Sequence, residues 1–148
     1  HALLKDPASQ VRCNAIKGLA HGSDERLKAY IFGKLEESID VTHADQQRSN
    51  SRSTDSSLSL TLQSHLDIKC ILEVIEITRL NESAILLDRA YRAWRRSIIY
   101  TPHRRAVIRA ISALGHPVRV STLMEALGDL DREVRLIAEE GLRRAYRP

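Results

Sequence analysis

The chain has 148 residues, of which 43% are hydrophobic and 4% aromatic, and its formal net charge at pH 7 is +4. This length suits a single domain with its own core, and no apolar run reaches the roughly 18 residues that a membrane span needs. No run alternates between apolar and polar residues as a strand does, so the composition favours an all-α protein without a membrane partner.

The first predicted helix starts at Asp6-Pro7, because Asp accepts hydrogen bonds from free amides and Pro fits the first helical position. Its apolar positions recur every four residues and form one stripe: Val11, Ala15 and Leu19. After Gly22-Ser23, a second helix is expected to run to about Asp40. The side chains that it should bury are Leu27, Ile31, Leu35 and Ile39.

Residues 42–60 are rich in Ser, Gln and Asp, and we expect a flexible insertion there, between the two helices of one hairpin. The following helix, from about Leu62 to Leu80, is apolar around most of its circumference and should be the most buried one. Ser83 is expected to cap a helix that ends near Tyr100.

The remaining residues predict three more helices. Thr101-Pro102 starts one that Gly115 closes. A short helix at about 120–127 then leads into the last one, at about 131–146.

Several stretches of the chain are similar to one another. Residues 4–19 align with residues 127–142, and two further copies are centred near Ala106 and Leu66. The last two clear copies lie 28 residues apart, a spacing typical of stacked helical hairpins. In the last copy Glu139 replaces the isoleucines at positions 16 and 111, which predicts a terminal repeat whose outer face meets water.

The shared pattern, Leu-x-Asp-Pro-x-x-x-Val-Arg-x-x-Ala-x-x-x-Leu, resembles the HEAT repeat of armadillo-type proteins, especially its short form named after phycobilisome lyases. The resemblance is strong at residues 3–20 and 123–145, fair at 98–115 and weak at 61–76. It implies a right-handed superhelical solenoid of about four antiparallel helical hairpins, with residues 1–148 as the C-terminal part of a longer solenoid.

In that family the second helix of each pair lines the concave surface, which implies a non-catalytic scaffold that binds a protein or peptide partner. The candidate contacts are Arg12, Asn14, Lys17, Arg105, Arg109, Arg135 and Glu139. The resemblance assigns a structural role to the repeat positions, whose Asp and Arg bond within and between repeats. These are Asp6, Val11, Arg12, Ala15, Leu19, Asp129, Val134, Arg135, Ala138 and Leu142. The copy at 98–115 has Thr101 and Val107 in place of that Asp and Arg.

Charge is distributed unevenly, with −2 on residues 1–78 and +6 on residues 79–148. Seven arginines and no acid occur from residue 89 to residue 109, and guanidinium groups pair well with phosphate. Nucleic-acid binding is therefore the alternative function, and ion pairs with Asp88 or Glu125 would instead make this a solvated face. Trp94 is expected in the core. The candidate phosphate contacts are Arg89, Arg92, Arg95, Arg96, Arg104, Arg105 and Arg109.

Cys13 and Cys70 lie far apart and have apolar neighbours, which favours two buried thiols in a reducing compartment, hence a cytoplasmic protein, over a disulfide or a metal site. The histidines form no metal-binding pair, and no phosphate-binding glycine loop or nucleophile motif occurs. We therefore expect no enzyme, cofactor, metal or small-molecule substrate. A third possibility, an accessory subunit of a lyase-type enzyme, follows from the resemblance alone.

Overall fold

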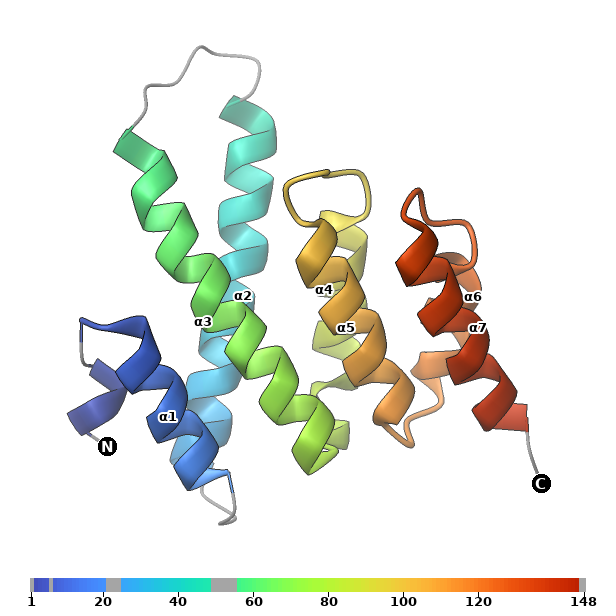
Figure 1. Ribbon diagram of the computed structural model, residues 1–148, viewed down its shortest axis with the longest axis horizontal. Helices are drawn as coiled ribbons and strands as arrows, with labels where there is room; N and C mark the ends of the chain where they lie inside the picture. The colour runs from blue at the N-terminus through green and yellow to red at the C-terminus, as the bar shows by residue number, and fades with distance from the viewer. Residues whose placement is uncertain (1, 6, 21–24, 49–55, 147–148) are drawn as a thin grey trace. The chain divides into compact units, whose positions relative to one another are not determined.

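A computed structural model of the chain describes residues 2–5, 7–20, 25–48 and 56–146 (Figure 1). Every regular element in these ranges is a helix, so the all-α prediction is confirmed. The chain divides into two compact units, His1–Val74 and Ile75–Pro148, whereas the sequence predicted one domain.

Unit 1 holds the short 3-10 helix η1 (Ala2–Lys5), α1 (Ser9–Leu19), α2 (Glu25–Arg48) and most of α3 (Ser56–Thr78). Helix α1 begins at Ser9, later than predicted, and its N-cap Ala8 provides no side-chain hydrogen bond. The predicted cap, Asp6, lies outside the described residues.

The core of unit 1 follows the predicted spacing on α2. Leu27, Ile31, Leu35 and Ile39 are all at most 5% exposed, which confirms this stripe. The predicted α1 stripe is only half-buried, and Ile16 is the buried residue of that helix. Helix α3 is buried at Ile68, Cys70, Ile71, Leu72 and Val74 but exposes Leu66, so it is apolar on more sides than the unit covers.

The flexible insertion predicted at about 42–60 is wrong where the structure describes it. Helix α2 continues to Arg48 and α3 already begins at Ser56, while residues 49–55 lie outside the described ranges. Thr42 is buried, and its hydroxyl donates to the Ser38 carbonyl at 2.8 Å. Polar residues such as Gln, Asp and Arg are compatible with a helix, so a polar composition alone does not indicate a loop.

Unit 2 contains η2 (Asn81–Ser83), α4 (Ala84–Trp94), α5 (Thr101–Ala113), α6 (Val118–Ala126) and α7 (Arg132–Tyr146). Helices α4 and α5 form one hairpin and α6 and α7 another, and α5 packs on α7 while α6 packs on α4 (Figure 1). The corresponding helices of the two hairpins therefore lie side by side.

Two predicted details of α4 are wrong. The helix ends at Trp94 rather than near Tyr100, and a turn follows. Ser83 accepts no capping hydrogen bond, because its hydroxyl is buried and donates to the Leu80 carbonyl at 2.6 Å.

The core of unit 2 is built on aromatic and branched aliphatic side chains. Trp94 is fully buried, as predicted, and stacks on Tyr100 with 5.5 Å between ring centroids. The repeat positions Val134 and Ala138 are fully buried and Leu142 nearly so, which confirms the predicted stripe on α7.

Candidate functional site

The three candidate contacts on α1 are engaged within unit 1. The Arg12 guanidinium donates to the Asp67 carboxylate at 2.8 and 3.1 Å, and both side chains are nearly buried, at 12% and 11% exposure. Lys17 Nζ lies 3.5 Å from a carboxylate oxygen of Glu73, and Asn14 accepts a hydrogen bond from another α1 side chain. Arg12 therefore holds α1 on α3 and is poorly suited to bind a partner, whereas the Lys17 pair is half-exposed and contributes little.

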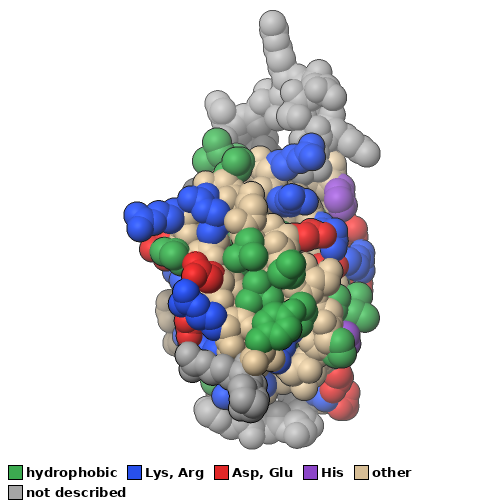
Figure 2. All heavy atoms as spheres, turned by 90° about the vertical axis from the view of Figure 1, so that its right-hand side faces the viewer, with side chains coloured by type: hydrophobic (Ala, Val, Ile, Leu, Met, Phe, Trp, Pro, Cys, Tyr) green, Lys and Arg blue, Asp and Glu red, His purple; other side chains and the backbone are tan. Residues whose placement is uncertain are grey.

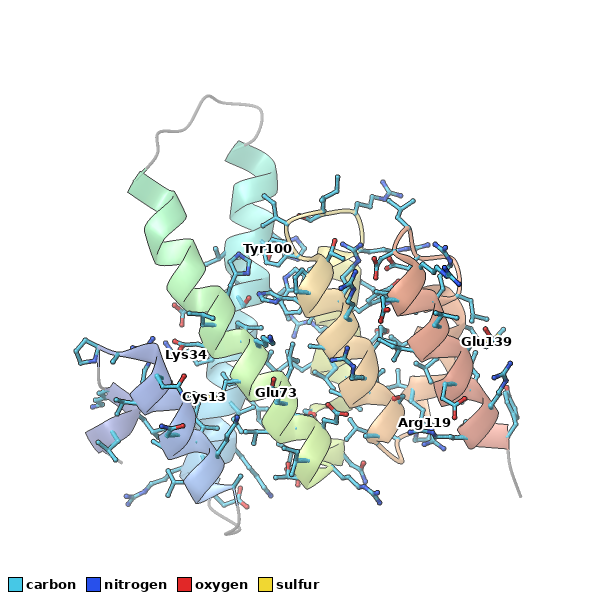
Figure 3. The ribbon with its side chains drawn as sticks, viewed as in Figure 1. Cys13, Lys34, Glu73, Tyr100, Arg119 and Glu139 are labelled. Atoms are coloured by element: carbon cyan, nitrogen blue, oxygen red, sulfur yellow. A yellow bond between two sulfur atoms is a disulfide. The ribbon has the colours of Figure 1, made fainter. Side chains whose placement is uncertain are left out.

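A disulfide joins Cys13 of α1 to Cys70 of α3, with their Cα atoms 5.8 Å apart (Cys13 is labelled in Figure 3). The prediction of two reduced thiols is wrong, and the expectation of a reducing, cytoplasmic compartment loses the basis on which it was made. Because 57 residues separate the two cysteines, only the packing of α1 on α3 brings them together.

In unit 2 a buried ion pair fixes the loop between α6 and α7. The Arg104 and Asp129 side chains are 3% and 0% exposed, with Nε and Oδ2 3.1 Å apart. The Tyr91 hydroxyl donates to the same carboxylate oxygen at 2.8 Å, and the Asp131 amide donates to the other at 2.8 Å. Burial and the hydrogen bond to Asp129 raise the pKa of the Tyr91 hydroxyl far above its usual value.

Arg104 also donates to two backbone carbonyls at the C-terminal end of α4. Its assignment to a phosphate-binding surface is therefore wrong.

Two of the candidate contacts on α5 and α7 shape the same loop. Arg105 makes two hydrogen bonds of 2.9 Å to the Asp131 carboxylate, and this lowers the pKa of Asp131 to about 2. Asp131 also accepts from the Val134 amide at 3.1 Å and so caps α7. Arg135 donates to the backbone carbonyl of Asp129 at 2.7 Å, as the repeat pattern implies for these two positions.

The other two candidates, Arg109 and Glu139, are exposed. Arg109 forms no ion pair with any residue that the structure describes. Glu139 pairs with Arg143 one turn further along α7 and lies on the side of the helix turned away from α5 (Figure 3). We call this side of unit 2, which Figure 2 faces, the outer face.

That outer face is not wholly polar. Helix α6 exposes Met124, at 56%, and the residue that follows its last turn, Leu127, is 39% exposed, while the neighbouring α7 exposes Leu136, at 49%. Figure 2 shows apolar side chains gathered in the middle of this face, with arginine and acidic side chains around them. We call Met124, Leu127 and Leu136 the end-face group.

The arginine run does not form one continuous free surface, because acids from other elements lie among its members. Arg92 lies 3.0 Å from Asp88 and 2.8 Å from Glu125, and Arg95 lies 3.8 Å from Glu125. Arg104 and Arg105 bind Asp129 and Asp131. Acidic side chains therefore neutralise four of the seven arginines in the run. The three exposed ones that form no ion pair with a described residue are Arg89, Arg96 and Arg109.

The loops α4–α5 and α6–α7 expose apolar side chains that the sequence analysis did not single out. Ile98, Ile99 and Leu130 are 84%, 72% and 79% exposed, the highest values for large apolar residues in the described ranges. Arg96, Ile98 and Leu130 line one hollow of about 170 Å³. The two adjacent isoleucines are visible in the sequence, but the helix predicted to end near Tyr100 hid their position in a loop.

No group of three or more potential metal ligands occurs among the described residues. None of the helices in those ranges is both long enough and apolar enough to cross a membrane. No protein-family model matches the chain, and neither does a curated protein or a solved structure.

Proposed function

We propose that the chain is a non-catalytic helical scaffold of the HEAT type that binds a protein partner. The proposal draws support from unit 2, where like helices of consecutive hairpins pack together, α4 on α6 and α5 on α7. Such stacking presents continuous rows of helices to a partner.

The observation that carries the proposal is the end-face group. Apolar side chains gathered on one face of a protein mark interaction surfaces, and these lie on two neighbouring helices rather than scattered singly. The partner that fits is an amphipathic helix, whose apolar stripe packs between the ridges of α6 and α7. Acidic and basic side chains on the rim, Glu139 and Arg143 among them, suit a mixed polar edge on that helix.

The candidate contacts on α5 and α7 that the resemblance implied form a weaker candidate for the partner-binding surface. Arg105 and Arg135 already use their guanidinium groups inside unit 2, so a partner would have to displace those hydrogen bonds. Among the candidate arginines on these two helices, Arg109 is the one that offers an exposed guanidinium without an ion pair to a described residue.

The test is photo-crosslinking from Met124, replaced by p-benzoylphenylalanine, in a lysate of cells that produce the protein. The matched control places the same group at Ile85, an exposed apolar residue of α4. We expect one discrete adduct at Met124 that persists at high salt and disappears when Leu136→Asp is added. Equal adducts at both positions, or an adduct that Leu136→Asp leaves intact, would contradict the proposal.

A second candidate is binding of nucleic-acid phosphates along the exposed side of α4. Arg89 lies on α4 and Arg96 in the turn that follows its last residue, Trp94; both are exposed, and neither has an ion pair to a described residue. If this surface binds a mixed-sequence duplex, affinity should fall steeply with salt and the slope should decrease by about one for each Arg→Ala change. Salt-independent binding, or none at low salt, rejects this candidate.

A further inference from the structure

We propose that unit 2 docks on an anionic membrane surface through the two loops that expose Ile98, Ile99 and Leu130, with Arg96 and Arg132 beside them. We call these five residues the isoleucine tip. Its proposed occupant is a lipid bilayer rather than a protein, so this proposal goes beyond the protein-binding function.

The exposure of the isoleucines is imposed by the fold. The backbone amide and hydroxyl of Thr101 both donate to the Ile98 carbonyl, at 3.1 and 2.7 Å. On either side, Arg104 holds the Ser97 carbonyl, and Tyr100 is buried against Trp94. The loop is therefore anchored at both ends, and its two isoleucines project into solvent from a fixed backbone.

Leu130 is held next to this loop in the same way. Arg135 donates to the Leu130 carbonyl at 3.1 Å and to the carbonyl before it at 2.7 Å. The Leu130 side chain lines the same hollow as Ile98 and Arg96, so two loops from different hairpins form one tip.

The charge beside the tip is positive. Arg96 and Arg132 are exposed, and neither has an ion pair to a described residue. The acid that lines the hollow, Asp131, is already neutralised by two hydrogen bonds from Arg105. An anionic phosphate that approaches Arg96 therefore meets no unbalanced carboxylate within the hollow.

A bilayer fits this arrangement better than a protein surface does. The apolar side chains project from loop ends, and a fluid interface can surround a projecting tip, whereas a protein would need a matching cavity. Burial of apolar side chains in the acyl boundary and attraction of arginines to anionic headgroups act together in peripheral membrane binding. The proposal needs no spanning helix.

Sedimentation with lipid vesicles tests the proposal. The probes are vesicles of phosphatidylcholine alone and vesicles that contain about one third phosphatidylglycerol. The tip variant is Ile98→Ser with Ile99→Ser and Leu130→Ser, and its control is Ile85→Ser, which removes an exposed apolar side chain from the opposite end of α4. The charge variant is Arg96→Ala, and its control is Arg89→Ala, another exposed arginine.

We expect binding to the anionic vesicles that weakens with salt and is much lower on neutral ones. The tip variant should lose at least about ten-fold in partitioning and Arg96→Ala about five-fold. Both controls should bind as the wild type does, and circular dichroism should show every variant folded, since the replaced side chains lie in solvent.

Three results would overturn the proposal. They are no binding of the wild type to anionic vesicles, binding that the tip variant retains, and equal losses in tip variants and controls. A protein that binds the tip while vesicles do not would show that the isoleucines serve a protein interface.

Discussion

Removing the carboxylate of Asp129 should destabilise unit 2 more than any exposed substitution does. In Asp129→Ala the Arg104 guanidinium stays buried, at 3% exposure, with only backbone carbonyls as partners, and it cannot give up its proton. Breaking one side of a buried ion pair costs about 3–5 kcal/mol. That is a large share of the roughly 5–15 kcal/mol by which a domain is stable.

The structure also predicts smaller losses of stability for other substitutions in the same hydrogen-bond network. Tyr91→Phe removes one hydrogen bond to a carboxylate that keeps its bonds from Arg104 and from the Asp131 amide, and should cost about 1.5–3 kcal/mol. Arg104→Met combined with Asp129→Leu removes both charges, so it should cost less than Asp129→Ala alone.

Urea unfolding followed by tryptophan fluorescence measures these differences directly. Trp94 is the only tryptophan of the chain and is buried in unit 2, so its emission reports on that unit. The control is Glu139→Ala, which removes an exposed ion pair and should change stability by less than about 1 kcal/mol. If the free energy of unfolding of Asp129→Ala lies within about 1 kcal/mol of that of the wild type, the Arg104–Asp129 pair does not hold the loop as described.

Reduction of the Cys13–Cys70 disulfide should destabilise unit 1 by up to about 4 kcal/mol, because it frees a long loop, and circular dichroism melts with and without reductant check this. Gly141→Ala should destabilise, because its Cβ would lie 2.8 Å from the Cβ of a serine on α5, whereas Gly33→Ala has open space and should stabilise by up to about 1 kcal/mol. If Gly141→Ala and Gly33→Ala shift the melting temperature in the same direction, this reasoning is contradicted. The pKa of Asp131 is lowered to about 2 in the folded state from 3.8, so its stabilising contribution exists above the higher value and is lost as pH falls through the lower one. Wild type and Asp131→Ala should therefore differ in urea midpoint near neutral pH and converge on acidification.

The periodic parts of the fold were predictable because one helix alone determines them. The stripe from Leu27 to Ile39 and the stripe from Val134 to Leu142 need only the helical period and the apolar character of each residue. Helix ends were less predictable, because capping depends on neighbouring structure. Asp131 caps α7, a role that the sequence did not indicate, whereas the predicted cap Ser83 turns its hydroxyl toward a preceding carbonyl.

The polar stretch after Asp40 shows the limit of reasoning from composition. Low hydrophobicity predicted a loop, yet α2 runs on to Arg48, since a helix needs a buried stripe only where another element covers it. Thr42 continues the stripe of Ile39 with a hydroxyl satisfied inside the helix, so its burial could not be read from its polarity.

The arginine run shows why local charge is a poor guide to a binding surface. Seven positive residues without an intervening acid look like a phosphate site, but the compensating acids come from elsewhere in the chain: Glu125 on α6, and Asp129 and Asp131 in the loop before α7. Because these acids lie far from the run in the sequence, their pairing with the arginines can be seen only in the packed hairpins. The arginines that remain without an ion pair to a described residue are the ones that carry functional information. Arg96 lines a hollow together with exposed apolar side chains. A guanidinium and apolar tips that are fixed side by side by the fold suit a surface that is anionic and apolar at once, and an anionic bilayer has both properties.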